Sequence, residues 1–300
     1  MIDLKKYRQF HFIGIGGIGM SALAEILLSR GFRVTGSDMN PSAIIEHLES
    51  LGAKFFQGHN PQNIEGADAV IYTAAISPEN PEFTKAKERN IPTFSRAELL
   101  GSLMSEYPQS IAICGTHGKT TTTSMLSLIL DDAKMDPTIL VGGNLPQIHG
   151  NVKIGQGPYF ITEACEYMDS FLSMRPMIEI ILNIDSDHLD YFKDIDHITS
   201  SFDTFASLVP DTGMVFAYAS NAFVASVINH LNCRVITFGF EPSCDYQAKN
   251  IKFNNVGMPA FDLYRKGETT PLTRIQLTVP GEHNVANALA SFACAYELGA

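Results

Sequence analysis

The residues of this 300-residue chain that are best suited to chemistry lie in one short stretch, residues 115–123, which read GTHGKTTTT. An apolar run precedes it, and Lys119 with four threonines opens a helical pattern. This order predicts a strand, a tight loop and a helix N-terminus, whose backbone N–H groups can surround a polyphosphate. Lys119 would reach the β- and γ-phosphates of ATP, and the Thr120 hydroxyl would bind Mg²⁺. The residues assigned to this ATP site are Gly115, Thr116, His117, Gly118, Lys119, Thr120 and Thr121.

The stretch departs from the phosphate-loop pattern GxxxxGK[ST] at one position, because the first glycine of that pattern would fall at Ile113. A glycine-rich turn capped by threonines is the alternative interpretation of the same residues. A phosphate loop requires a strand before it and a helix after it, and the sequence predicts both. We therefore favour the ATP site.

A second glycine-rich stretch, residues 14–21 (GIGGIGMS), is suited to binding a pyrophosphate. Gly14, Gly16 and Gly19 follow the GxGxxG spacing, and Asp38 comes nineteen residues after Gly19. Side chains at the glycines would block the approach of a pyrophosphate to the backbone. The residues expected at this cradle and at the strand ends beside it are Gly14, Gly16, Gly17, Ile18, Gly19, Met20, Ser21, Ser37, Asp38, Thr73 and Asn80.

Two polar residues in the first part of the chain have a second interpretation as helix caps. Asn80 precedes Pro81, which is the sequence of an N-cap and a first helical residue, so capping and ligand contact are equally favoured for Asn80. Ser95 stands three residues before Glu98, which is the spacing of a capping box. For Ser95 we favour capping alone.

A carboxylate and an imidazole follow two further apolar runs. Glu163 ends the run at residues 158–163, and His188 follows the run at residues 177–184. In a parallel sheet both would lie on the edge that carries the phosphate loop, as Mg²⁺ ligands or outer groups. A carboxylate suits Mg²⁺, whereas an imidazole is a less usual ligand for it. The neighbouring acids interpreted as caps and solvated turns are Asp185, Asp187 and Asp190.

Asn284 and Asn287 lie three residues apart at the start of an alanine-rich helical pattern, so they share one helix face. They are either an N-cap and a polar face or amides that recognise an adenine edge and position a nucleotide.

The elements that must hold these residues alternate between strand and helix, which predicts an α/β fold with parallel sheets covered by helices. A polar, proline-containing break at residues 106–110 divides a Rossmann-like domain, 1–106, from a phosphate-loop α/β domain, 107–300. Residues 246–279 alternate as antiparallel strands do. The expected strands are 10–14, 32–38, 54–56, 69–72, 138–141, 158–163, 177–184, 214–217, 234–238, 250–254, 260–264 and 274–278; the expected helices are 22–29, 42–51, 97–104, 121–130, 198–208, 222–231 and one ending at 298.

Composition excludes several classes of protein. A net charge of −11 argues against a nucleic-acid partner, which needs a basic surface. Five cysteines without a CxxC pair fit a reduced interior better than a disulfide framework. No window has the length of a membrane span and no leader peptide is visible, so we expect a cytoplasmic protein without a membrane partner. The oligomeric state is left open.

Five motifs together resemble the Mur ligase family, the ATP-dependent amide ligases of bacterial peptidoglycan synthesis. They occur in the family's order and cover nearly the whole chain. The motifs are residues 11–21 (HFIGIGGIGMS), residues 115–123, Glu163, residues 183–188 (NIDSDH) and residues 281–287 (GEHNVAN).

The resemblance implies functions that the spacing alone does not. The GxGxxG domain would hold a UDP-sugar, and the substrates would be UDP-N-acetylmuramate and L-alanine, with ATP and Mg²⁺. Such ligases carry a third domain, which the resemblance places after residue 300. By residue, the catalytic positions are Lys119, Glu163 and His188, the metal positions are Thr120, Glu163 and His188, and the additional ATP contacts are Asn284 and Asn287.

Three alternatives remain open from the sequence. A murein-tripeptide recycling ligase of the same family would use the same UDP-sugar, although residues 14–21 resemble the alanine-adding members more. An NAD-dependent oxidoreductase would explain the GxGxxG motif and Asp38 but leaves the Lys119 loop without a role. A non-catalytic nucleotide-binding module is the third.

Overall fold

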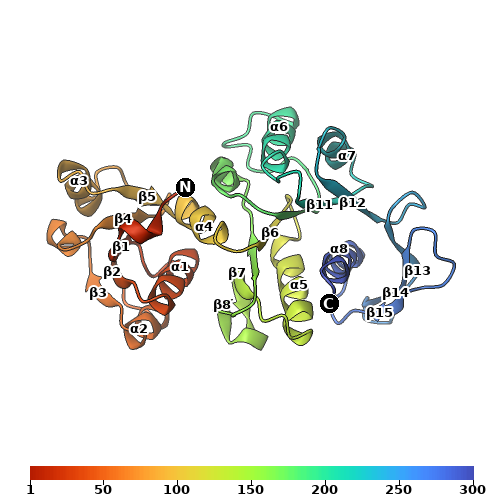
Figure 1. The fold of residues 1–300 in the computed structure, drawn as a ribbon, viewed down its shortest axis with the longest axis horizontal. Coiled ribbons are helices and arrows are strands. Elements are labelled where there is room, and N and C mark those ends of the chain that lie inside the picture. The colour runs from red at the N-terminus through yellow and green to blue at the C-terminus, as the bar shows by residue number, and fades with distance from the viewer. The chain divides into compact units, whose positions relative to one another are not determined.

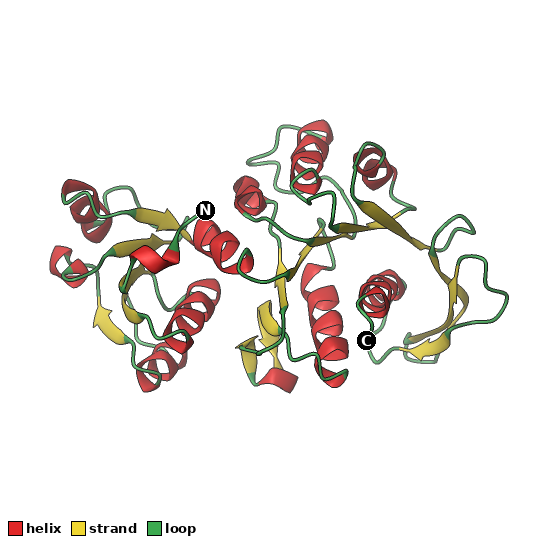
Figure 2. Cartoon of the chain, in the orientation of Figure 1, coloured by secondary structure: helices red, strands yellow, loops and turns green.

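The computed structural model describes residues 1–300, which form two compact units, Met1–Glu106 and Tyr107–Ala300. Each unit has its own sheet and its own helices (Figures 1 and 2). No helix combines the length and the apolar character that crossing a membrane requires.

Unit 1 is built on a five-stranded parallel sheet with the order β3-β2-β1-β4-β5. The order reverses between β1 and β4, so the carboxyl ends of these two strands flank the crevice where α/β sheets bind ligands. The predicted Rossmann-like sheet is confirmed. Its elements are β1 (Gln9–Ile13), α1 (Ile18–Ser29), β2 (Arg33–Asp38), α2 (Ala43–Ser50), β3 (Lys54–Gln57), β4 (Ala69–Tyr72), α3 (Pro81–Glu88), β5 (Thr93–Ser95) and α4 (Arg96–Met104), with short 3₁₀ turns at Leu4–Lys6 and Pro61–Ile64.

Local sequence explains where these elements begin. The Asn80 side chain accepts hydrogen bonds from the first turn of α3, and Pro81 is the first helical residue. Ser95 and Glu98 form the predicted capping box of α4. Two elements differ from expectation: α1 begins at Ile18, four residues early, and β5 was not expected, because three residues are too few to show an alternating pattern.

Unit 2 is built on a ten-stranded mixed sheet with the order β15-β14-β13-β12-β11-β10-β6-β9-β7-β8. The strands from β13 to β7 in that order run parallel, so β6, β9, β10, β11 and β12 end on one edge. Its elements are β6 (Gln109–Cys114), α5 (Lys119–Asp132), β7 (Thr138–Leu145), β8 (Gly150–Lys153), β9 (Tyr159–Glu163), β10 (Ile178–Ile181), α6 (Ile195–Ala206), β11 (Met214–Tyr218), α7 (Ala222–Ile228), β12 (Arg234–Gly239), β13 (Tyr246–Phe253), β14 (Pro259–Arg265), β15 (Thr273–Gln276) and α8 (His283–Glu297), with 3₁₀ turns at Pro146–Ile148 and Tyr167–Ser173.

The predicted antiparallel segment is confirmed at β13, β14 and β15, and a second antiparallel pair, β7 and β8, was not expected. β13 begins at Tyr246 rather than residue 250, because its first residues pair in parallel with β12. β7 continues to Leu145, four residues beyond the expected end of that strand at residue 141.

Helices α5 and α8 pack against each other beside this sheet, as Figure 1 shows. Small buried residues allow the approach: the Ser291 hydroxyl lies 3.2 Å from the carbonyl oxygen of Thr122, and Ala288 and Ala295 are buried on α8. This packing brings the helix of the phosphate loop and the helix with the asparagine pair together.

A carboxylate is buried in unit 1 near the carboxyl ends of β1 and β2. Glu82, in the first turn of α3, has no exposed surface. It accepts hydrogen bonds from the Ser37 hydroxyl at 2.5 Å and the Asn63 amide at 2.6 Å. His11 Nε2 lies 3.5 Å away, an ion-pair distance rather than a hydrogen bond, and His59 Nδ1 lies 3.2 Å away. Burial alone would raise the pKa of Glu82, but its contacts outweigh burial and lower that pKa to about 2.

Replacing Glu82 by glutamine should therefore destabilise unit 1 in a pH-dependent way. The lowered pKa contributes stability that is full above the ordinary value near 4.5 and is lost as the pH falls toward 2. We expect a loss of about 2 kcal/mol for Glu82→Gln at pH 7, shrinking below about pH 4.5. Hydrogen exchange of the backbone amides of β1 and β2 measures this loss of stability within unit 1.

Glu49→Gln is the matched control, because Glu49 is an exposed carboxylate on α2. It should change the exchange rates little at any pH. A Glu82→Gln defect that stays constant from pH 7 to pH 3.5 would contradict the ionised, hydrogen-bonded state of Glu82.

Candidate functional site

The loop between β6 and α5, residues 115–118, has the backbone of a phosphate loop. Gly115 and Gly118 lie at φ +136° and +90°, a region that side chains disfavour. Asn183, after β10, holds the loop: its side-chain oxygen accepts from His117 N at 2.8 Å and its amide donates to His117 O at 2.9 Å. Thr116 N also donates to Asn183 O at 3.1 Å. The loop is therefore fixed against the end of a neighbouring strand.

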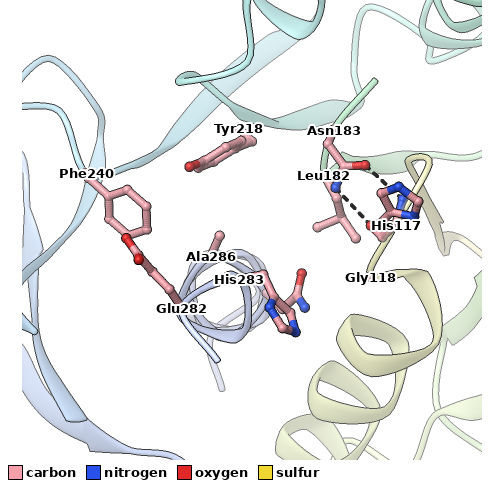
Figure 3. Close-up of a pocket in the computed structure, with 10 residues that line it drawn as sticks. His117, Gly118, Leu182, Asn183, Tyr218, Phe240, Glu282, His283 and Ala286 are labelled. Carbon is pink, nitrogen blue, oxygen red and sulfur yellow. Dashed lines mark hydrogen bonds between the residues drawn. The ribbon is translucent and has the colours of Figure 1, made fainter. Parts of the chain in front are cut away.

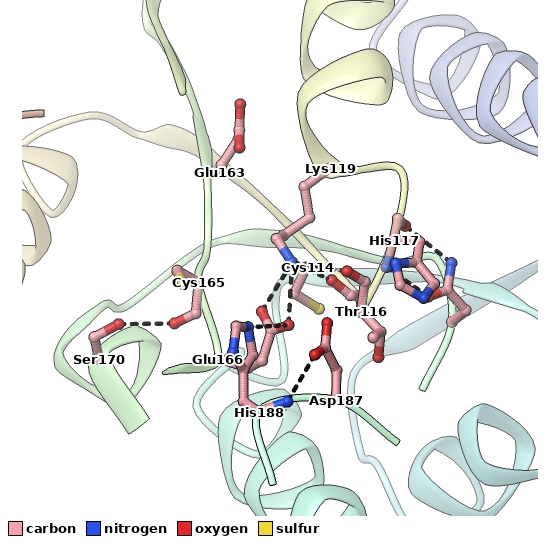
Figure 4. Close-up of polar contacts among 12 residues, drawn as sticks. Cys114, Thr116, His117, Lys119, Glu163, Cys165, Glu166, Ser170, Asp187 and His188 are labelled. Carbon is pink, nitrogen blue, oxygen red and sulfur yellow. Dashed lines mark hydrogen bonds and ion pairs between the residues drawn. The ribbon is translucent and has the colours of Figure 1, made fainter. Parts of the chain in front are cut away.

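Lys119, the first residue of α5, points back under this loop. Its ammonium donates to the carbonyl oxygens of Gly115 at 2.6 Å and Thr116 at 3.2 Å. It also contacts both carboxylate oxygens of Glu166, at 3.1 and 2.9 Å (Figure 4). Glu166 was not among the predicted site residues, and its only sequence signal is its place three residues after Glu163.

Thr120 and Glu163 meet at the mouth of the loop. The Thr120 hydroxyl donates to Glu163 Oε2 at 3.0 Å, and the backbone N–H of Gly142 donates to Glu163 Oε1 at 2.6 Å. A Cβ on Gly142 would lie 2.8 Å from the carboxylate, so only glycine leaves Glu163 this position. A hydroxyl and a carboxylate are the oxygen ligands that suit Mg²⁺, which usually keeps several waters and takes further oxygens from phosphates. The pair therefore fits the predicted metal.

His188 lies apart from that pair in the structure, so the predicted metal set of Thr120, Glu163 and His188 stays a prediction as far as His188 is concerned. Its backbone is left-handed, with φ +52°, and its ring lies against Tyr167, with ring centroids 4.9 Å apart. Its Nε2 lies 3.9 Å from Glu166 Oε1, and Figure 4 shows Glu163 on the other side of Lys119. No group of three or more His, Cys, Asp and Glu side chains is arranged to hold a metal.

The acids near His188 are part of turns, as predicted. Asp185 and Asp187 each accept a hydrogen bond from the backbone N–H of the following residue, and Asp190 accepts one from the Tyr167 hydroxyl. These contacts shape the loop that carries His188.

A cavity of about 550 Å³ opens on one side of the phosphate loop (Figure 3). Most of its lining is apolar or aromatic, which suits a flat heterocycle such as a nucleobase. The lining residues are His117, Gly118, Leu182, Asn183, Tyr218, Phe240, Glu282, His283, Ala286 and Asn287.

The predicted asparagine pair divides between this cavity and the structure behind it. Asn287 lines the cavity, and a Cβ on Gly118 would lie 2.6 Å from its side-chain oxygen. Asn284 is buried, donates to Pro280 O at 2.7 Å and accepts from the Asn287 amide at 3.0 Å. Asn284 therefore orients Asn287 and does not line the cavity itself.

Sequence reasoning missed the aromatic part of this cavity. Tyr218 ends β11, and Phe240 directly follows β12. The rule that placed Glu163 and His188 at strand ends applies equally to both, but aromatic residues at strand ends are also common core residues. Their positions at strand ends were therefore visible in the sequence, but these positions did not distinguish cavity residues from core residues.

The glycines of unit 1 make room for the side chains around the second cradle. A Cβ on Gly14 would lie 3.2 Å from Thr73, and one on Gly16 would lie 2.9 Å from the Asp38 carboxylate, which accepts from Gly16 N at 2.9 Å. A Cβ on Gly19 would lie 3.2 Å from the side chain of Arg96. Arg96, the first residue of α4, was not predicted and is a cation beside the N-terminus of α1.

Several residues predicted for this cradle already have partners in the framework. The Ser37 hydroxyl is buried and donates to Glu82, and the Asn80 oxygen caps α3. Met20 and Ser21 are buried on α1, where the Ser21 hydroxyl donates to Ile18 O. Gly17 is the N-cap of α1, and Ile18 beside it is exposed. The structure thus groups Gly14, Gly16, Gly17, Gly19, Asp38 and Thr73 around the cradle.

Each of the two units matches a protein-family model. The model described as "Mur ligase family, catalytic domain" matches residues 9–108, and the model described as "Mur ligase middle domain" matches residues 113–295.

Two curated relatives show how far the similarity extends. The chain is 51% identical over 300 residues to UDP-N-acetylmuramate–L-alanine ligase of Acetivibrio thermocellus, covering 100% of this chain and 64% of that protein. It is 53% identical over 298 residues to the enzyme of the same name from Clostridium acetobutylicum, covering 99% and 64%. The chain therefore spans slightly less than two thirds of the length of these relatives.

Two solved structures are also similar. UDP-N-acetylmuramate-alanine ligase from Thermotoga maritima has a TM-score of 0.82 and 30% identity, with 97% of this chain and 65% of that chain covered. The UDP-N-acetylmuramate:L-alanyl-gamma-D-glutamyl-meso-diaminopimelate ligase from Neisseria meningitides has a TM-score of 0.88 and 27% identity, with 98% and 94% covered.

Proposed function

We propose that this chain, which belongs to the Mur ligase family, provides the UDP-sugar and ATP sites of a ligase that joins L-alanine to UDP-N-acetylmuramate. One observation carries the proposal: Thr120 and Glu163 meet at the mouth of a phosphate loop, and the Lys119 ammonium lies under that loop. The identity of 51% and 53% to two enzymes of that name supports the choice of substrates.

The proposed reaction has two steps. An oxygen of the lactyl carboxylate attacks the γ-phosphorus of ATP, the bond to the β,γ-bridging oxygen breaks, and an acyl phosphate and ADP form. The amine of L-alanine then attacks the acyl carbon, phosphate leaves with the bonding electrons, and the nitrogen loses a proton. Phosphoryl transfer needs positioning and charge neutralisation more than covalent help from the protein.

The chain supplies that positioning from backbone and cation together. The N-terminus of α5 would face the triphosphate, because the N–H groups of its first turn have no partner within the helix, and the Lys119 ammonium would neutralise charge that develops on it. Thr120 and Glu163 would hold Mg²⁺, which supplies further neutralisation of the phosphate oxygens when bound. The cavity beside Asn287 would take the adenine.

The cradle of unit 1 is proposed to hold the pyrophosphate of the UDP-sugar. The N-terminus of α1 and the side chain of Arg96 lie beside it, and both favour an anion. The same geometry would suit a dinucleotide, but an oxidoreductase would leave the Lys119 loop of unit 2 unused.

The tripeptide-recycling ligase is the second candidate, favoured by the TM-score of 0.88 to the Neisseria enzyme. Sequence identity favours the alanine ligase, at 51% against 27%. Comparing L-alanine with the tripeptide as acceptor, using the full-length protein, decides between them.

Lys119→Ala in the full-length protein should reduce ADP formation by about 10²–10³-fold or more, since one donor to a developing charge contributes that much. Binding of UDP-N-acetylmuramate, measured by calorimetry, should stay within about twofold, because its proposed site lies in unit 1. Lys134→Ala, an exposed lysine just after α5, is the control and should change neither. Equal losses of ADP formation and UDP-sugar binding would contradict the division between units.

Glu163→Gln tests the metal site without turnover. The quantity measured is the ratio of the ADP affinity in Mg²⁺ to the ADP affinity in EDTA. In the unchanged chain this ratio should be well above one, and in the variant it should fall about tenfold or more. The exposed Glu268→Gln should keep the ratio. An unchanged ratio in Glu163→Gln would remove Glu163 from the metal site.

A further inference from the structure

The ammonium of Lys119 has no hydrogen-bond donor left for a phosphate in this structure. A lysine ammonium has three N–H donors. Two point at the carbonyl oxygens of Gly115 and Thr116, at 2.6 and 3.2 Å, and Glu166 takes the rest through contacts at 2.9 and 3.1 Å. Only 17% of the Lys119 side chain is exposed. A nucleotide phosphate must therefore displace one of these partners to reach Lys119.

Glu166 is the partner that competes most directly with a phosphate. It is a carboxylate with 3% of its side chain exposed, so it is poorly screened by water. A phosphate oxygen and a carboxylate oxygen are both anionic acceptors for the same ammonium. They also repel each other, and this repulsion is stronger in a buried site because water screens it less. The two carbonyl oxygens are neutral, and their contacts keep Lys119 under the loop.

The backbone around Glu166 is fixed in an unfavourable conformation, which indicates that its position is determined by the surrounding structure. Met168 and Asp169 are both left-handed, with φ of 52° and 53°, and neither is glycine. The Asp169 carboxylate accepts from the Tyr191 hydroxyl at 2.6 Å. The Ser170 hydroxyl donates to Cys165 O at 2.8 Å. The segment therefore holds Glu166 at Lys119 from both sides.

We propose that Glu166 is a positioning residue that retains Lys119 in a resting state, and that a nucleotide binds by exchanging Glu166 for phosphate on the ammonium. His188 Nε2, 3.9 Å from Glu166 Oε1, is the neighbour left to Glu166 after the exchange. The proposal rests on the proposed function of the loop as an ATP site. It adds that nucleotide binding is weakened by the free energy needed to open the ion pair between Lys119 and Glu166.

The two roles that Glu166 could have predict opposite changes in nucleotide affinity when its carboxylate is removed. A carboxylate that only prepares Lys119 for phosphate would, when removed, weaken nucleotide binding. A carboxylate that retains Lys119 would, when removed, tighten it, because the anion no longer has to open an ion pair or approach a buried negative charge. We expect Glu166→Gln to tighten ADP binding about tenfold, which corresponds to about 1.4 kcal/mol.

The experiment is calorimetry of the 300-residue chain with ADP and, separately, with adenosine, both in EDTA so that no metal contributes. Adenosine carries no phosphate, so its affinity should be equal in the unchanged chain and in Glu166→Gln. A merely structural defect would weaken both ligands. The control Asp190→Asn removes one negative charge from the loop of His188, where Asp190 contacts Tyr167 rather than Lys119. It should change ADP affinity less than twofold.

A second variant covers the case in which Glu166→Gln does not fold. Glu166→Asp keeps the charge but shortens the side chain by one methylene, which draws the carboxylate away from Lys119. It should tighten ADP binding two- to threefold. Unchanged or weaker ADP binding in whichever variant folds would overturn the proposal. Failure of the unchanged chain to bind ADP at all would instead overturn the proposed ATP site.

Discussion

An acidic chain can hold polyphosphates only where local dipoles and a few cations outweigh its overall charge, and this constraint governs both cradles. The net charge is −11, so long-range attraction works against an anionic ligand. Each cradle therefore combines a helix N-terminus with one basic side chain: α5 with Lys119, and α1 with Arg96. These local fields act over a few ångströms, where screening by salt is least.

Three carboxyl groups near the phosphate loop avoid excess repulsion in three different ways. Glu163 is held by Thr120 and Gly142, where a cation would neutralise it, and Glu166 is paired with Lys119. Glu179, on β10, is fully buried next to the Cys114 thiol, and burial raises its pKa to about 8. At neutral pH Glu179 is therefore mostly uncharged and adds little negative charge behind the loop.

Sequence reasoning was most successful where backbone chemistry decides the structure. Glycine spacing, helix caps and apolar runs located the phosphate loop, the cradle of α1 and the antiparallel segment, because these depend on local conformation. The same reasoning missed Glu166 and the clamp made by Asn183, and it assigned Ser37 to the ligand. Which partner a polar side chain takes depends on the tertiary structure: the Ser37 hydroxyl faces Glu82, forty-five residues away. No local pattern carries that information.

The contact between Gly118 and Asn287 joins the proposed base site and the phosphate loop into one piece of unit 2. A side chain at residue 118 would collide with the Asn287 oxygen, so α8 approaches the loop only because a glycine is there. Asn284 fixes Asn287 from behind, and Asn183 fixes the loop from the other side. A base held beside α8 is thereby placed at a set distance from the loop. Under the proposed function, binding energy from the adenine would then serve to position the triphosphate, which is where it favours the transition state.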